Sequence, residues 1–149
     1  MSVSVQEGDF DLGQEITDMT KGRRDIGAVV SFIGLVRDSP EGGLLSMELE
    51  HYPGMTEQAL AEIEKQAAKR WSLNASRIIH RFGDLPTGAQ IMMVATASPH
   101  RGHAFEAAEF LMDYLKTDAP FWKKEHFKDG AGWVDSKAAD ADAKQRWSS

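Results

Sequence analysis

Residues 91–116 have the sequence IMMVATASPHRGHAFEAAEFLMDYLK, and this stretch decides the fold class. Its apolar run, residues 91–97, predicts a buried strand. Ser98 and Pro99 follow and predict a helix start, with serine as the N-cap and proline at the first helical position. Apolar side chains then recur at helical spacing on one face, at Phe105, Ala108, Met112 and Leu115. A buried strand is therefore expected to lead directly into an amphipathic helix.

The sequence before this stretch predicts a pair of strands. Residues 27–36 are an apolar, β-branched run typical of a buried strand, in which Gly34 indicates a bulge or a close backbone approach. The turn sequence DSPEGG follows at 38–43. Apolar and polar residues then alternate over 45–50, as in a half-buried strand. We expect 27–36 and 45–50 to pair as a hairpin.

Because strands are expected to meet in hairpins, the pattern favours an α+β fold with a mostly antiparallel sheet and packed helices over a doubly wound parallel sheet. A length of 149 residues fits a single domain over 1–149. Residues 1–10 are expected to be a loose arm or an edge strand. The other expected elements are helices over 12–21, 56–71 (with Thr56 as N-cap) and 137–147, a strand over 77–82, a turn over 83–88 and an irregular or extended segment over 121–134.

The composition excludes several kinds of site. The chain has no cysteine, so it holds no disulfide, zinc–thiolate site, iron–sulfur cluster or cysteine nucleophile. A net charge of −6 disfavours a general nucleic-acid binder. No apolar run approaches the ~20 residues that span a bilayer, and the N-terminal residues lack a signal-peptide pattern, so we expect a cytoplasmic protein without membrane contact.

Positive charge gathers in one segment of this acidic chain. Residues 119–128 (APFWKKEHFK) carry three lysines and one glutamate, a formal +2, which leaves −8 for the other residues. Such a segment fits a small anionic ligand or an acidic partner, although a solvated surface patch would have the same composition.

Two potential cations, His100 and Arg101, fall in the first turn of the helix that is expected to start at Ser98. A helix N-terminus favours anions, so a phosphate or carboxylate between these side chains and the free N–H groups would explain them. The alternative is that both side chains point into solvent. Lys116 lies about four turns further along the same helix. To bring these groups into one site, the chain after Pro120 must fold back or a second subunit must help.

Lys123 follows two aromatic residues, Phe121 and Trp122. Aromatic neighbours can desolvate an ammonium group and make it a usable acid, base or nucleophile. Alternatively, the aromatics belong to the core and the lysines extend outward. His80 is expected to be a structural histidine. No histidine or carboxylate spacing suggests a metal, and the chain has no phosphate-binding glycine loop, serine elbow or dinucleotide fingerprint, so we expect no metal or cofactor.

Four segments closely resemble the catalytic, large-subunit family of molybdopterin synthases, the MoaE family. They are LEHYPGMTEQALAEI (49–63), HRFGDL (80–85), SPHR (98–101) and FEAAEFLMDYLKTDAPFWKKE (105–125). The resemblance implies an α/β-hammerhead fold. It also implies sulfur transfer to a pterin phosphate, cyclic pyranopterin monophosphate (precursor Z), which becomes molybdopterin in molybdenum cofactor biosynthesis. The sulfur would come from the C-terminal Gly-Gly thiocarboxylate of a small ubiquitin-like carrier, in a heterotetramer built on a homodimer of large subunits.

The resemblance also implies roles for individual residues. Lys116 and Lys123 match the two catalytic lysines of the family. The substrate-binding positions that match are Leu35, Val36, Arg37, His100, Arg101, Lys116, Lys123, Lys124, Glu125 and Lys137. Leu35 departs from the family, which often has Gly-Lys-Val-Arg where this chain has Gly-Leu-Val-Arg. Two other functions stay open beside this one: a non-catalytic scaffold that docks the carrier tail, and an RNA- or nucleotide-binding domain, which the negative charge disfavours.

Overall fold

A computed structural model of the chain describes residues 2–128, 130–134 and 138–148. In this part of the chain the strands form two four-stranded sheets. The first sheet has the order β1 (Val3–Gln6), β4 (Ala75–Arg81), β6 (Gln90–Ser98), β2 (Ala28–Leu35). The second has the order β5 (Gly83–Pro86), β3 (Leu44–His51), β7 (Phe121–Phe127), β8 (Gly130–Val134).

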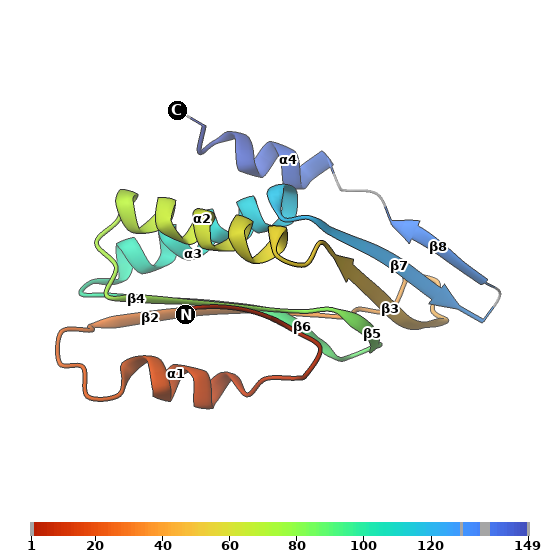
Figure 1. The fold of residues 1–149 in the computed structure, drawn as a ribbon, viewed down its shortest axis with the longest axis horizontal. Helices are drawn as coiled ribbons and strands as arrows, with labels where there is room; N and C mark the ends of the chain where they lie inside the picture. The colour runs from red at the N-terminus through yellow and green to blue at the C-terminus, as the bar shows by residue number, and fades with distance from the viewer. Residues whose placement is uncertain (1, 129, 135–137, 149) are drawn as a thin grey trace.

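Helices cover both faces of the first sheet (Figure 1). Helix α1 (Leu12–Thr20) lies on one face, while α2 (Met55–Arg70) and α3 (Arg101–Asp118) lie on the other, and α4 (Ala138–Gln145) packs beyond α3. Side chains alternate across a strand, so neighbours on β4 enter different cores. Ile78 belongs to the large core beneath α2 and α3, whereas Ile79 packs toward α1. This alternation explains why two adjacent residues of β4, Ile78 and Ile79, are both buried.

Strand β6 is the centre of the first sheet, and almost all of it is buried. It pairs antiparallel with β2 on one side and with β4 on the other. Among the strand pairs of the described residues, only β1–β4 is parallel, so the α+β fold with mostly antiparallel sheets is confirmed. The N-terminal segment forms the edge strand β1, which was one of the two alternatives for residues 1–10. The single domain over 1–149 stays a prediction, although residues of both sheets share the large core.

The predicted hairpin between 27–36 and 45–50 is wrong. Strand β2 pairs with β6 in the first sheet, and β3 pairs with β5 and β7 in the second. The cause lies at Val36, whose N–H donates to the Ala89 carbonyl and whose carbonyl accepts from the Gly88 N–H. These bonds direct the chain away from β2 before the DSPEGG turn begins. A turn sequence therefore connects two sheets here, instead of two paired strands.

Strand β2 is also not buried as predicted. It lies at the sheet edge, and Val29, Phe32 and Leu35 expose 37%, 44% and 55% of their surface. The bulge expected at Gly34 is confirmed, because the pairing with β6 shifts between Gly34 and Leu35. A Cβ atom at Gly34 would lie 3.3 Å from the Met92 sulfur, which agrees with a close approach.

Both predicted N-caps are wrong, although the helices themselves form. Ser98 is the last residue of β6, where Ala28 pairs with it, and α3 begins after the N-cap His100. Helix α2 has Gly54 as its N-cap, at a φ of 85°. Thr56 is fully buried and bonds with Tyr52 instead.

The segment over 121–134 is extended, one of its two predicted alternatives, and forms the hairpin β7–β8. Two further expectations need correction. The predicted turn at 83–88 contains the short strand β5. Phe105 is 59% exposed and therefore does not belong to the buried face of α3. That face carries alanines and larger apolar residues: Ala104, Ala107, Ala108, Phe110, Leu111 and Leu115.

Candidate functional site

Helix α3 separates the predicted site residues into two groups. His100 is its N-cap, Arg101 is its first residue, and both are exposed. Lys116 lies in the last turn, 16 residues after His100. At a rise of 1.5 Å per residue, the two ends of the helix are about 24 Å apart. Within one chain, the structure therefore does not bring His100 and Arg101 to Lys116.

The chain after α3 folds back and brings Lys123 toward Lys116. The helix ends before Pro120, as expected because the residue that precedes a proline avoids helical conformation. Strand β7 then runs antiparallel to β3, with Lys123 opposite Leu49. Both lysines are close enough to His80 for their charges to lower its pKa. The two predicted catalytic lysines thus both lie within electrostatic range of one buried histidine.

Neighbouring residues of β7 face opposite sides of the second sheet. Phe121 and Lys123 lie opposite His51 and the buried Leu49, so their side chains are on the inner face. Lys124 is on the outer face, with its ammonium 5.3 Å from the centre of the Trp133 ring.

Glu125 lies opposite Met47, on the inner face with Lys123. The cationic segment 119–128 therefore does not form one patch, because Lys123 lies on the inner face of the second sheet and Lys124 lies on its outer face. Phe121 packs inward, as expected if the aromatics belong to the core, whereas Trp122 is 46% exposed. Desolvation of the Lys123 ammonium by these rings stays a prediction.

His80 is 4% exposed and lies between the two sheets. Its ring stacks on Phe121 with the centroids 3.7 Å apart and the planes 19° apart. Its Nδ1 lies 2.8 Å from the Arg81 carbonyl oxygen. Burial lowers the pKa of His80 to about 3, and the charges of Lys116, Lys123 and His51 act in the same direction, while the hydrogen bond to Arg81 opposes them. The imidazole is therefore neutral at physiological pH.

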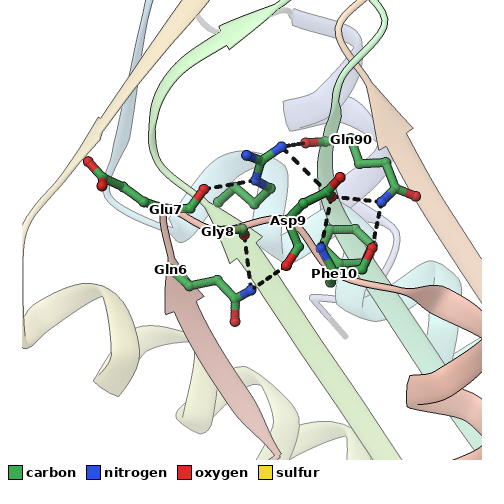
Figure 2. Close-up of polar contacts among 7 residues, drawn as sticks. Gln6, Glu7, Gly8, Asp9, Phe10 and Gln90 are labelled. Carbon is green, nitrogen blue, oxygen red and sulfur yellow. Dashed lines mark hydrogen bonds and ion pairs between the residues drawn. The ribbon is translucent and has the colours of Figure 1, made fainter.

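A network of polar contacts fixes the strand end that carries His80. Arg81 donates from Nε to the Glu7 carbonyl and from Nη1 to the Gln90 carbonyl. Figure 2 shows Gln90 joined to Asp9 and to Phe10 across the same network. The hydrogen bond from Gln90 and one from the Phe10 N–H lower the pKa of the Asp9 carboxyl. The loop after β1 is thereby tied to the ends of β4 and β6 beside His80.

The segment around Arg37 lies at the lysine end of the molecule. Gly34 and His80 pair with the same residue, Met92, from opposite sides, so β2 ends in the row of the sheet that carries His80. Leu35 and Arg37, which follow, are exposed. Val36 is 2% exposed and its backbone groups are both bonded, so its side chain belongs to the core. Contact between this segment and a ligand would involve the flanking residues.

A shallow pocket of about 390 Å³ opens beside the site, between β3 and β5. His51 and Phe82 line it, and their rings are 4.6 Å apart. Carboxylates of Glu48, Glu50 and Asp84 also line it, so its charge does not suit an anion. In the described residues no three His, Asp or Glu side chains gather as a metal site requires, and no helix is long and apolar enough to cross a membrane. Lys137 lies outside the described residues.

Sequence reasoning missed the place of His80 at the centre of the lysine pair. The expectation of a structural histidine agrees with its burial, but nothing in its local sequence predicts its neighbours. Its neighbours Phe121 and Lys123 are placed by the pairing of β7 with β3, two strands more than 60 residues apart in the chain. The alternation in HRF, where a histidine shares a strand with apolar residues, was the one available signal for an inward-facing ring.

A comparison with protein families matches residues 5–118 to the model of the MoaE protein. The chain belongs to the MoaE family. The matched residues include Lys116 and end before Lys123. A MoaE-family relative from Ralstonia nicotianae, named molybdopterin synthase catalytic subunit, is 57% identical over 147 residues, which cover 98% of this chain and 84% of the relative.

Solved structures of the MoaE family have the same fold. The molybdopterin biosynthesis MoaE protein from Burkholderia ambifaria is 48% identical with a TM-score of 0.86, and the match covers 99% of this chain and 98% of that one. The molybdopterin synthase from Staphylococcus aureus is 30% identical with a TM-score of 0.83, over 91% of this chain and 98% of that one. The expected hammerhead-type α+β fold is thus the fold of the family.

Proposed function

We propose that this chain is the catalytic subunit of a molybdopterin synthase, a sulfurtransferase that converts cyclic pyranopterin monophosphate to molybdopterin. Membership in the MoaE family supports the activity. The observation that carries the assignment of the site is that Lys116 and Lys123 both lie within electrostatic range of the buried, neutral His80. Two ammonium groups on the same side of the molecule suit a reaction in which an anionic carrier tail meets an anionic substrate.

The sulfur must come from a partner, since a chain without cysteine cannot carry a persulfide. In this proposal, the partner is a small ubiquitin-like carrier that ends in a Gly-Gly thiocarboxylate. Lys123 lies beside the thiocarboxylate carbon and stabilises negative charge as sulfur leaves. Lys116 transfers a proton or anchors the substrate.

The phosphate of the substrate is assigned to His100 and Arg101 at the N-terminus of α3. Because these residues lie about 24 Å from Lys116 in one chain, a second copy must supply them. The chain therefore works as a homodimer within a heterotetramer, with each site built from two copies. The exposed apolar side chains at the edge strand β2 and on α3, Val29, Phe32, Leu35 and Phe105, suit contact with such a second copy.

The remaining assignments complete the site. Arg37, with Leu35 beside it, borders the lysine pair and contacts the pterin, and Glu125 follows on the inner face of β7. Lys124, on the outer face, and Lys137 add positive charge for the substrate or the carrier tail. A cytoplasmic location is part of the proposal, which fractionation of cells that express the chain would test.

Reconstitution tests the proposal. The protein is mixed with cyclic pyranopterin monophosphate and a thiocarboxylated carrier, and molybdopterin is measured. We expect product with the wild-type chain and a loss of orders of magnitude with Lys123→Ala. A folded complex with the carrier that forms no product would support the scaffold function instead. Binding to RNA that weakens steeply with salt would instead support an RNA- or nucleotide-binding domain.

A further inference from the structure

His80 connects the two sheets within range of the charges of both Lys116 and Lys123. It lies on β4 of the first sheet, and the ring on which it stacks, Phe121, begins β7 of the second. Phe121 precedes Lys123 by two residues and so faces the same side of β7. The stack therefore restrains the start of the strand that carries Lys123.

A hydrogen bond fixes the orientation and the tautomer of the His80 ring. The Arg81 carbonyl can only accept, so Nδ1 carries the proton in this contact of 2.8 Å. In the neutral ring Nε2 then keeps a lone pair and can only accept. The carbonyl does not drift, because the Arg81 side chain is itself bound to the backbone of Glu7 and Gln90.

We propose that His80 is a positioning residue for the lysine pair, because its stacked and hydrogen-bonded ring fixes the start of β7 and so sets where the Lys123 ammonium lies relative to Lys116. This inference rests on the proposed function, in which both lysines act on the same substrate. His80 acts through Phe121 and β7; it need not touch the substrate.

The chemistry of imidazole explains why a histidine suits this place. The ring offers a flat face to Phe121 and an N–H to a buried carbonyl, and it does so without charge. A phenylalanine would keep the stack but leave the carbonyl without this donor. A lysine or arginine would add a third positive charge beside Lys116 and Lys123, in a buried position where charge is costly.

The first test measures single turnovers of the complex with the thiocarboxylated carrier. We expect His80→Ala to lower the rate constant by about 10- to 100-fold, as small misplacements of reacting groups do. The substrate concentration for half-maximal rate should stay within about twofold, because the phosphate contacts are elsewhere. His80→Phe, which keeps a ring to stack on Phe121, should recover most of the rate. Ile78→Val, on the same face of β4, is the matched core control and should leave the rate unchanged.

A second readout needs no substrate. Reductive methylation of the folded protein, followed by peptide mass mapping, gives the modification rate of Lys123 relative to the exposed Lys69. We expect this ratio to change by about threefold or more in His80→Ala, because local opening of β7 becomes more frequent, and to stay constant in Ile78→Val. If His80→Ala does not fold, His80→Asn takes its place, since it keeps a side-chain N–H and removes the ring.

The outcomes separate the two proposals. If the wild-type chain forms no molybdopterin, the proposed function fails, and the methylation ratio still tests the placement of Lys123. If the wild-type chain is active, and a folded His80 variant without the ring keeps the wild-type rate and methylation ratio, His80 is a structural residue only and the inference is overturned.

Discussion

Lys123 lies directly opposite Leu49 across the β3–β7 pair, so a charged side chain shares a sheet face with a residue that is 1% exposed. Cross-strand neighbours on one face lie about 5 Å apart, which places the stem of the lysine against the core. The ammonium group must therefore leave the apolar region at a defined point. Because its stem is held against a core residue, Lys123 is the residue whose mutation tests the site most directly.

Lys123→Ala should lower turnover by orders of magnitude and leave folding nearly intact. In the proposed function, this variant removes the charge beside the thiocarboxylate carbon, whereas truncation of a partly exposed side chain costs little stability. Product formation, carrier binding and thermal unfolding are measured together, with Lys69→Ala on α2 as the control. A large drop in the unfolding temperature would identify a structural lysine.

A double variant, His100→Ala with Arg101→Ala, should weaken binding of the pterin phosphate and leave the lysine end unchanged. If the site is shared, mixing this variant with Lys123→Ala restores activity. Random exchange makes half of the dimers hybrid, and each hybrid has one intact site of two, so about a quarter of wild-type activity is expected. If activity stays absent after verified subunit exchange, Lys123 and the pair His100 and Arg101 must act within the same chain.

The stability of the protein should fall on acidification between pH 6.5 and 5, in part through His80. The folded state keeps this residue neutral because its pKa is about 3, whereas the unfolded chain takes up a proton near the ordinary value of 6.5. The unfolded state thus binds more protons in this range, so the free energy of unfolding decreases as the pH falls. The slope for one proton approaches ~1.4 kcal/mol per pH unit. Urea unfolding at several pH values should show a shallower slope for His80→Phe; an equal slope would mean that His80 takes up its proton in the folded state.

Gly27→Ala should destabilise the protein and disturb the turn that precedes α3. A Cβ atom at this position would lie 2.1 Å from the Pro99 carbonyl oxygen, so the backbone before His100 must move. Strain of this kind costs about 1–3 kcal/mol. Gly8→Ala is the control, because nothing lies within 4 Å of its added Cβ. Chemical denaturation measures the cost, and substrate affinity shows whether the phosphate site moved with the turn.

The sequence predicts the elements of this fold better than their pairing. Strand β6 and helix α3 follow from local periodicity, and the bulge at Gly34 follows from a glycine within an apolar run. The partner of β2 does not follow, because hydrogen bonds at Val36 with residues 88 and 89 decide it. The predicted N-cap Ser98 is wrong for a related reason. Ser98 stays in the sheet because Ala28 pairs with it, and local cap propensity cannot overcome that pairing.

The candidate site is also predicted only in part, because its assembly depends on strand pairing. The resemblance to the MoaE family gave the residue types and their roles. The helix spacing already indicated that one straight helix cannot bring His100 to Lys116, so that the chain must fold back after Pro120 or a second subunit must help. The approach of Lys123 to Lys116 depends on the direction in which the chain leaves Pro120. That direction is set by the pairing of β7 with β3, and no spacing within 116–123 encodes it.

Helix α3 acts as a ruler in the proposed dimer. Its first residue serves one reaction centre and its last turn serves another, so the spacing of 16 residues from His100 to Lys116 sets the distance between two centres at about 24 Å. One inserted residue would lengthen the helix by only 1.5 Å but rotate Lys116 by about 100° away from its partners. Outside the residues assigned to the site and to the dimer contact, the exposed face of this helix can vary, but its length can change only by whole turns together with the second copy.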